Sequence, residues 1–230
     1  MKKLIGRIER AVSGRVLRLY DRITDRRICG QSLVKTVAGI SEDKKKGIGG
    51  TASQSTHYLF LKYIFSHVSL TESDTLIDVG CGKGRVLAFL IKEKYPCRIC
   101  GIEYNEAVGK IAQEWTAKYE QAEVLIGDAF QLDYNDYTVL TLARPFLPVT
   151  FCQFIEKLEE TLTHPITLVS WYDQNLVRYV YNRSGWHAAY HELVKRVRGW
   201  KIALYPSSFT VWTYDPAERK AKETAGSDEA

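Results

Sequence analysis

Between residues 55 and 183 the sequence alternates short apolar runs with stretches of helical spacing, and this alternation is what most limits the fold. Helical spacing begins at Ser55 and continues to Val68. Strands are then expected at 75–79, 98–103, 122–127, 137–143 and 166–172, and helices at 84–95, 105–120, 149–162 and 173–183. This order predicts a doubly wound α/β fold, in which helices cover both faces of a mostly parallel sheet.

The C-terminal part departs from this alternation. Residues 186–197 (WHAAYHELVKRV) and 208–215 (SFTVWTYD) are rich in β-forming residues, and no convincing helix lies between them. They are expected to pair as an antiparallel hairpin at the end of the sheet. Residues 216–230 are charged and poor in apolar side chains, which predicts a disordered tail.

The N-terminal segment combines helical spacing with positive charge, which predicts an amphipathic basic helix over residues 1–28. Its apolar positions are Leu4, Ile5, Ile8, Val12, Val16, Leu19, Tyr20 and Ile23, and the arginines between them are Arg7, Arg10, Arg15, Arg18, Arg22 and Arg26. The apolar stripe could pack on the domain, which is the interpretation we prefer. Alternatively, the helix could contact an acidic membrane surface or an acidic partner.

Residues 41–54 are polar and glycine-rich and show no periodicity, which predicts a flexible linker or lid. The chain is therefore divided into three parts. These are the basic N-terminal helix with its linker (1–54), a main domain (55–215) and the tail (216–230).

The net charge of +5 is unevenly distributed. Residues 1–50 contain 13 Lys and Arg against 5 acidic residues, whereas residues 51–230 contain 19 against 22. A domain that binds nucleic acid along its length needs positive charge of its own, so a nucleic-acid partner is less expected than a small molecule. The sequence has no apolar run typical of a membrane span or signal peptide, and its five scattered cysteines suit reduced thiols. A cytoplasmic location is expected.

The motif most informative about chemistry, Asp78-Val79-Gly80-Cys81-Gly82-Lys83-Gly84, ends an expected strand and opens an expected helix. Glycines at such a turn let the backbone come close to a ligand, and the helix start offers unpaired N–H groups. The spacing is not that of a dinucleotide fingerprint, because the third glycine falls one residue early and position 85 is arginine. The motif therefore predicts a bound ligand other than a standard dinucleotide.

Two further acids end the next two strands. Glu103 follows Gly84 by 19 residues, where a carboxylate can accept hydrogen bonds from both hydroxyls of a ribose. Asp128, in the run Gly127-Asp128-Ala129-Phe130, could accept from an adenine amino group. Because open α/β sheets bind ligands at the carboxyl ends of their strands, these acids together predict an adenosine ligand.

The runs IDVGCGKGRVL, GIEYN and IGDAF resemble, in this order, the cofactor-binding motifs of class I S-adenosylmethionine-dependent methyltransferases. The resemblance covers about residues 55–215 and implies a Rossmann-like, seven-stranded sheet completed by the C-terminal hairpin. It implies S-adenosylmethionine as cofactor, with its methionine part over the glycine loop, its ribose at Glu103 and its adenine at Asp128. The cofactor-binding residues that it implies are Asp78, Gly80, Cys81, Gly82, Gly84, Glu103, Tyr104, Asp128 and Ala129.

The acceptor side departs from the pattern of that family. Many members that methylate nitrogen carry Asn or Asp before Pro-Pro-Tyr or Pro-Phe after the fourth strand, and this side chain accepts the hydrogens of the target amine. Here the run is Ala143-Arg144-Pro145-Phe146. Arginine has donors only, so Arg144 can hold a carboxylate or phosphate but not an amine. Arg144 is interpreted either as the anchor of an anionic acceptor or as a rim residue paired with an acid.

Methyl transfer favours a water-poor aromatic site, because proximity and orientation supply most of the rate. The candidates for this wall are Phe146, Trp171, Tyr172 and Tyr58, each of which could instead be an ordinary core residue. Asp173 and His57 could act as a base toward a hydroxyl acceptor. No metal is predicted, because Cys97 and Cys100 have the spacing of half a site but no second pair accompanies them.

These observations favour a methyltransferase that acts on a small, polar or anionic acceptor. Two alternatives stay open. One is a protein-lysine or RNA methyltransferase that uses the basic N-terminal arm for docking, and the other is an inactive cofactor-binding module. The acidic balance of the main domain argues against RNA, and the intact cofactor motifs argue against an inactive module. The acceptor atom and the oligomeric state cannot be read from the sequence.

Overall fold

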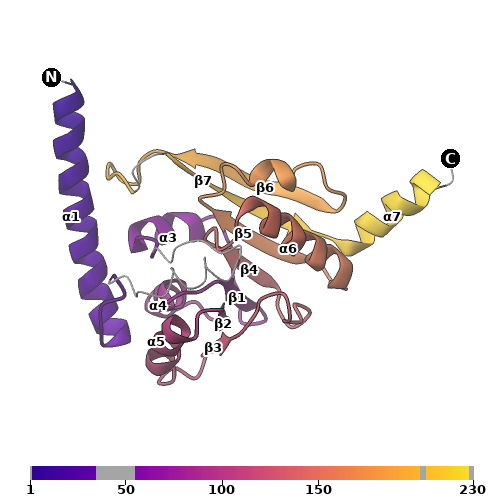
Figure 1. The fold of residues 1–230 in the computed structure, drawn as a ribbon, viewed down its shortest axis with the longest axis horizontal. Helices are drawn as coiled ribbons and strands as arrows, with labels where there is room; N and C mark the ends of the chain where they lie inside the picture. The colour runs from indigo at the N-terminus through magenta and orange to yellow at the C-terminus, as the bar shows by residue number, and fades with distance from the viewer. Residues whose placement is uncertain (1, 35–54, 203–205, 228–230) are drawn as a thin grey trace.

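A computed structural model describes residues 2–34, 55–202 and 206–227, and its strands form one sheet in the order β3-β2-β1-β4-β5-β7-β6 (Figure 1). The parallel strands are β1 (Thr75–Val79), β2 (Arg98–Glu103), β3 (Ala122–Ile126), β4 (Val139–Leu142) and β5 (Ile166–Trp171). β6 (Trp186–Val194) and β7 (Ser207–Tyr214) pair antiparallel, and β7 also pairs antiparallel with β5. The predicted fold class is confirmed.

Successive strand residues point to opposite faces of the sheet, so each face builds its own core. Leu76 lies in the core shared with α3 (Tyr58–Phe65), α4 (Arg85–Lys92) and α5 (Glu106–Thr116). The next residue, Ile77, lies in the core shared with α6 (Pro148–Thr161) on the other face. The near-continuous apolar runs of the parallel strands are explained by this burial on both sides.

The chain reverses its direction across the sheet at β1. β2 and β3 follow on one side of β1, and β4 and β5 follow on the other. In open α/β sheets such a reversal creates a crevice at the carboxyl ends of the strands. The glycine motif leaves β1 directly into this crevice.

The predicted helix at 173–183 is wrong, because only Val177–Tyr179 form a short 3₁₀ helix, η1. The apolar spacing is real, since Leu176 and Val180 are buried. The backbone bonds, however, mostly join residues three apart, as from Leu176 N to Asp173 O and from Val180 N to Val177 O. The segment is therefore a series of tight turns, not an α-helix.

The predicted disorder of residues 216–230 is also wrong over α7 (Pro216–Ser227), which is a helix (Figure 1). Asp215 caps its start, because Oδ1 accepts a hydrogen bond from Ala217 N at 2.8 Å. Pro216 occupies the first turn, where its missing N–H costs nothing, and Glu218 follows the cap by three residues. Local capping therefore stabilises a helix here, although the polar composition of the segment favours disorder.

The predicted N-terminal helix is present as α1 (Lys2–Cys29), which lies along the outside of the molecule beyond α3 and α4 (Figure 1). The expected packing of its apolar stripe on the domain is wrong for the described members of that stripe, because they are exposed: Val12, Val16, Leu19, Tyr20 and Ile23. The side chains that α1 buries include Ser13, Leu17, Asp21, Thr24 and Asp25. The predicted linker at 41–54 lies outside the described residues. No described helix is long and apolar enough to cross a membrane.

Candidate cofactor and acceptor site

The glycine motif forms a tight loop between β1 and α4. Gly80, Gly82 and Gly84 have φ values of 74°, 58° and 82°, which glycine adopts without strain. The N–H groups of Gly80 and Cys81 both donate to the carbonyl of Ile102 on β2, at 2.9 and 3.0 Å. The loop is thereby fixed against the neighbouring strand.

A side chain at two of these glycines would collide with the protein. A Cβ at Gly84 would lie 2.8 Å from Trp115 Cζ2, and a Cβ at Gly80 would lie 2.6 Å from Pro145 Cβ. The second contact is the more informative one, because Pro145 follows β4. The glycine loop and the segment after β4 therefore adjoin, which brings the predicted cofactor and acceptor regions together.

Glu103 ends β2 with its carboxylate turned toward the glycine loop. Its Oε2 accepts a hydrogen bond from Gly82 N at 2.8 Å, and its Oε1 accepts one from Asn105 N at 2.9 Å. An ionised carboxylate has about four acceptor positions, so two backbone bonds can orient it while it also serves a ligand. This orientation suits a pair of hydroxyl groups.

Asp78 is a buried carboxyl group at the end of β1, with 2% of its surface exposed. Burial raises the pKa of Asp78 to about 7, the hydrogen bond from Thr141 lowers it and the nearby charge of Glu103 raises it. The Thr141 hydroxyl, on neighbouring β4, donates to Asp78 Oδ1 at 2.7 Å. A positively charged ligand group close to Asp78 would favour its ionised form.

The third acid, Asp128, is exposed after β3, and its Oδ1 accepts a hydrogen bond from Phe130 N at 2.9 Å. Its neighbour Ala129 is buried, while Tyr104 after β2 is 49% exposed. The ring of Phe130 lies 5.7 Å from that of Phe146, which follows β4. An open carboxylate, an exposed ring and an aromatic pair thus line the carboxyl edge of the sheet.

Arg144 and Tyr172 follow the neighbouring strands β4 and β5, and both have a left-handed backbone, with φ values of 53° and 58°. Side chains other than glycine rarely adopt this conformation, and such strain concentrates at functional sites. Burial raises the pKa of Tyr172 to about 12, and the positive charge of Arg144 acts in the opposite direction. The two side chains therefore lie within electrostatic reach beside the glycine loop.

Two of the predicted aromatic residues lie inside the protein. Trp171 is fully buried, and its Nε1 donates to Thr56 Oγ1 at 2.9 Å. Tyr58 is 2% exposed, and its hydroxyl donates to Asp25 Oδ1 of α1 at 3.0 Å. Of the predicted wall, Tyr172 and Phe146 are the half-buried members.

Asp173 is buried as well, with 1% of its surface exposed. Its carboxylate accepts hydrogen bonds from three hydroxyl groups, those of Ser170, Ser208 and Thr210. These donors come from β5 and β7, so the carboxylate ties the two strands together. This geometry indicates a structural group more than a base.

The α1–α4 charge cluster consists of Asp21, Asp25, His57, Tyr58 and Arg85. Arg85 donates to Asp25 Oδ2 at 2.7 Å and to Asp21 Oδ2 at 3.3 Å, and all three side chains are at most 5% exposed. Asp21 also holds His57 Nδ1 at 2.5 Å and accepts from Tyr58 N at 3.2 Å. Because Arg85 directly follows the third glycine, the cluster anchors α1 to the loop.

Sequence reasoning named His57 and Tyr58 singly but missed the cluster. The sequence feature that could have revealed the cluster is a pair of acids, Asp21 and Asp25, four residues apart on one face of a mostly basic helix. Burial raises the pKa of Asp25, and the charge of Arg85 opposes this shift. An isolated buried carboxylate would be costly, so each acid depends on its partners.

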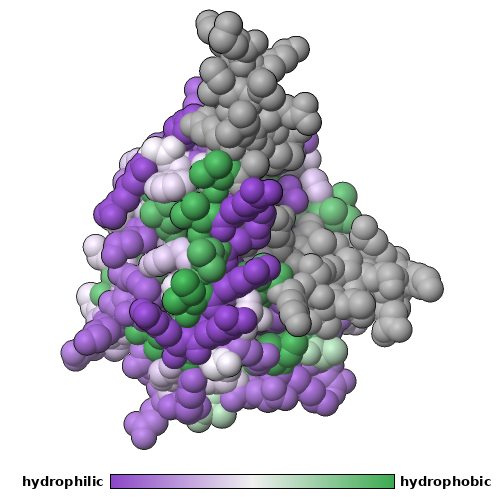
Figure 2. All heavy atoms as spheres, turned by 90° about the vertical axis from the view of Figure 1, so that its left-hand side faces the viewer, coloured by the Kyte–Doolittle hydropathy of each residue, from purple (hydrophilic) through white to green (hydrophobic). Residues whose placement is uncertain are grey.

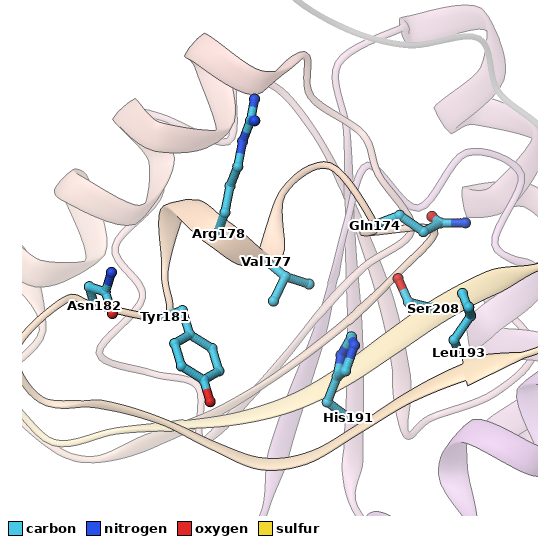
Figure 3. Close-up of a pocket in the computed structure, with 8 residues that line it drawn as sticks. All are labelled: Gln174, Val177, Arg178, Tyr181, Asn182, His191, Leu193 and Ser208. Carbon is cyan, nitrogen blue, oxygen red and sulfur yellow. The ribbon is translucent and has the colours of Figure 1, made fainter.

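A cavity of about 470 Å³ opens between η1 and strands β6 and β7 (Figure 3). It is lined by Gln174, Val177, Arg178, Tyr181, Asn182, His191, Leu193 and Ser208. His191 Nδ1 lies 2.8 Å from Thr210 Oγ1, and Thr210 in turn donates to the buried carboxylate of Asp173. The volume lies in the range of small-molecule sites.

Cys97 and Cys100 belong to the cores on opposite faces of the sheet, so they do not form half of a metal site. Within residues 2–34, 55–202 and 206–227, no group of three or more His, Cys, Asp or Glu side chains is arranged to hold a metal ion.

Residues 70–172 match the model of a family described as a methyltransferase domain. A probable ribosomal RNA small subunit methyltransferase A from Methanococcus maripaludis (strain C6) is 29% identical over 110 residues, which cover 44% of this chain and 40% of the relative. The chain thus matches about two fifths of the length of such curated relatives.

Solved structures show the same architecture. An RNA methyltransferase from Salinibacter ruber, in complex with S-adenosyl-L-homocysteine, matches with a TM-score of 0.53 and 22% identity over 68% of this chain and 90% of that one. Geranyl diphosphate C-methyltransferase from Streptomyces coelicolor A3(2) also matches with a TM-score of 0.53, at 10% identity over 68% and 79% of the two chains. At these identities the likeness shows a shared fold.

The family match and the sheet order together identify residues 70–172 as a class I, Rossmann-like methyltransferase domain. Domains of this class use S-adenosylmethionine, so the predicted family and its cofactor are confirmed.

Proposed function

We propose that this protein transfers a methyl group from S-adenosylmethionine to a small acceptor with a polar or anionic group. The contact between Gly80 and Pro145, where an added Cβ would lie 2.6 Å away, carries this proposal. It sets the cofactor loop against the segment that presents Arg144. We take residues 55–215 as the catalytic domain, with α1 fixed to it by the charge cluster.

The residues at the carboxyl ends of β1, β2 and β3 fit the parts of the cofactor. Three left-handed glycines let the backbone pass close to its methionine part, and Glu103 is oriented by two backbone N–H groups toward its ribose hydroxyls. Asp128 is exposed for the adenine amino group, and Asp78 lies where a cationic group would favour its ionised form. Cys81, Tyr104 and Ala129 complete the proposed contacts. When bound, the cofactor supplies a methyl group on a positively charged sulfur.

Arg144 is proposed to anchor the acceptor. Its guanidinium can form a paired, charge-assisted contact with a carboxylate or phosphate, which orients the acceptor as well as binding it. The half-buried rings of Tyr172 and Phe146 would exclude water beside it. The left-handed backbone at Arg144 and Tyr172 is consistent with side chains held in place for this purpose.

His57 is a better candidate than Asp173 for a base toward a hydroxyl acceptor. Asp21 holds His57 Nδ1 at 2.5 Å, which leaves Nε2 as the nitrogen that can take a proton. The Asp173 carboxylate is already engaged by three hydroxyl donors. An amine or thiolate acceptor would need no such base.

An RNA acceptor is the second candidate, because a curated relative and one similar structure are named as RNA methyltransferases. The charge of this chain favours the small acceptor. Residues 51–230 contain 19 basic against 22 acidic residues, whereas binding of an RNA backbone depends on positive charge. Weak binding of RNA fragments and turnover of a metabolite would together support the first candidate.

The cofactor assignment is tested by titration calorimetry of the full chain. S-adenosylmethionine and S-adenosylhomocysteine are expected to bind, and NAD is not. Tight binding of NAD without binding of either sulfur nucleoside would contradict the assignment. Screening of metabolites with a labelled methyl group then identifies the acceptor, for which a carboxylate or phosphate is expected.

Arg144→Ala is expected to leave cofactor affinity unchanged and to lower kcat/KM toward that acceptor about thirtyfold to a thousandfold. The reason is the loss of a charge-assisted pair that contributes about 2–4 kcal/mol in the transition state. Arg144→Lys should recover only part of this loss, because a point charge cannot replace the planar fork.

The matched control is Arg98→Ala, which removes an exposed arginine paired with Glu123 at the opposite, amino end of the sheet. This variant should keep the wild-type kcat/KM. Wild-type turnover by Arg144→Ala, or an acceptor without an anionic group, would show that Arg144 is only a rim residue.

A further inference from the structure

The outward face of α1 exposes apolar and basic side chains together. We name it the basic–apolar face. Its apolar members are Val12, Val16, Leu19, Tyr20 and Ile23, each 43–59% exposed. Its basic members are the exposed Arg15, Arg18, Arg22, Arg26 and Arg27. Figure 2 shows a row of apolar surface flanked by hydrophilic side chains on this side of the molecule.

The charge cluster explains why this face is turned outward. Asp21 and Asp25 lie on the opposite side of the helix and are buried by Arg85, with 1% and 0% of their surfaces exposed. They are the only acids between Val12 and Cys29. Packing on the domain therefore removes both negative charges from the surface of this part of α1 and leaves a uniformly positive face.

The turn between β6 and β7 lies beside this face. Val197 and Trp200 exchange two backbone hydrogen bonds of 3.0 and 2.9 Å, and the two residues between them have φ values of 48° and 81°. This two-residue turn presents Trp200, which is 36% exposed, close in sequence to Arg198. A shallow hollow is lined by both residues together with Val12 of α1.

We infer that the basic–apolar face docks on the surface of an anionic phospholipid bilayer, with α1 lying in the plane of the interface. A helix of this kind binds by inserting its apolar stripe at the headgroup boundary while its arginines attract the acidic lipids. Tryptophan is enriched at the same depth, which suits Trp200. Charge complementarity and apolar burial are thus satisfied by one partner.

The arrangement of α1 allows this contact. The helix lies along one side of the molecule with the sheet and the other helices behind it (Figure 1). Its 28 residues correspond to a length of about 42 Å at 1.5 Å per residue. The sequence continues the apolar spacing toward the N-terminus with Leu4, Ile5 and Ile8. A flat surface can therefore meet the face that residues 12–27 present.

Other occupants fit the same face less well. RNA would use the arginines but gains little from a central row in which all members except Tyr20 are aliphatic. A second copy of the chain would bury the apolar row, but over residues 12–29 it would bring together two positive helix faces whose acids, Asp21 and Asp25, are both buried. An anionic bilayer uses both features.

The test is sedimentation of the full-length protein with vesicles of phosphatidylcholine alone or with phosphatidylglycerol added, without cofactor or acceptor. Binding is expected only to the anionic vesicles and should weaken with added salt. Arg18→Glu with Arg22→Glu should lower the partition coefficient at least about 25-fold, since each basic residue contributes about fivefold. Val16→Glu with Leu19→Glu should lower it at least about tenfold, because the apolar row no longer inserts.

Lys220→Glu with Lys222→Glu is the matched control for the arginine pair, since it makes the same change of charge at exposed sites on α7, which lies on the opposite side of the molecule from α1 (Figure 1). It should bind vesicles as the wild type does, and all variants should keep the wild-type melting temperature because the changed side chains are exposed. Equal binding to both vesicle types, or binding to neither, would overturn the inference. So would a dimer in light scattering that Val16→Glu with Leu19→Glu dissociates, or ribosomal RNA binding without vesicle binding. Vesicle binding is measured independently of methyl transfer, so failure of one proposal leaves the other standing.

Discussion

Acidic side chains serve the two halves of the site in different ways. In the cofactor half, Glu103 accepts from the backbone N–H groups of Gly82 and Asn105, and Asp128 accepts from that of Phe130. Around the acceptor half and the neighbouring charge cluster, the acids are bound mainly by side chains from other elements. Asp173 is held by hydroxyls of β5 and β7, and Asp21 and Asp25 are held by Arg85.

Among these five acids, the difference separates the proposed ligand-binding acids from structural ones; Asp78, which is buried and accepts from Thr141, lies outside this division. A carboxylate oriented by nearby backbone groups stays at the surface of its loop and can accept from a ligand. A carboxylate paired with side chains far away in the sequence is buried, and its partners depend on it. The comparison predicts that substitution of Glu103 or Asp128 weakens cofactor binding, whereas loss of a buried acid or of its partner, as at Asp173 or Arg85, weakens the fold.

Arg85→Ala should produce the largest effect. It leaves Asp21 and Asp25 buried without their cation, which is expected to lower the free energy of unfolding by about 3–5 kcal/mol. Denaturant titration measures this loss. Arg98→Ala is the matched control, because it breaks an exposed pair whose members are 64% and 50% exposed, and should cost less than about 1 kcal/mol. Equal losses of unfolding free energy in the two variants would contradict the structural role of the buried acids Asp21 and Asp25.

Glu103→Ala tests the cofactor half. Loss of charge-assisted ribose bonds is expected to weaken S-adenosylhomocysteine binding by about 1.5–3 kcal/mol, or about tenfold to 150-fold. Calorimetric titration measures the affinity. Asp173→Asn is the contrasting variant, and it should lower stability while the affinity stays within about twofold of wild type. The comparison breaks down if Asp173→Asn weakens binding as much as Glu103→Ala does.

The parts of the fold that depend on local sequence were predictable. The apolar runs place the five parallel strands and the hairpin, and the glycine motif places the loop after β1. The start of α7 also has a local helix signal in Asp215-Pro216 with Glu218 following, whereas the polar composition of the segment favours disorder. The three-residue turns at 173–183 had no such signal, because Leu176 and Val180 satisfy helical spacing as well.

The packing of α1 could not be predicted from spacing. An apolar stripe normally faces the core, so the stripe was expected inside. The acids that face the core instead depend on Arg85, which is 64 residues from Asp21 and 60 from Asp25. Likewise, Arg144 could be named from the motif, but its left-handed backbone and its proximity to Tyr172 result from the meeting of β4 and β5.

The smallest effect concerns Asp78, the one deeply buried acid of the cofactor half. Its pKa is about 7 in the folded protein, above the ordinary value of 3.8, so between these values the folded state holds a proton that the unfolded state lacks. Stability should therefore rise as the pH falls from 8 to 6, by about 1.4 kcal/mol. Urea titration of the cofactor-free protein measures this change. Asp78→Asn cannot ionise and should lose this part of the pH dependence, whereas an unchanged slope would assign it to other groups. Bound S-adenosylmethionine should also reduce the slope, because its positive charges favour ionised Asp78.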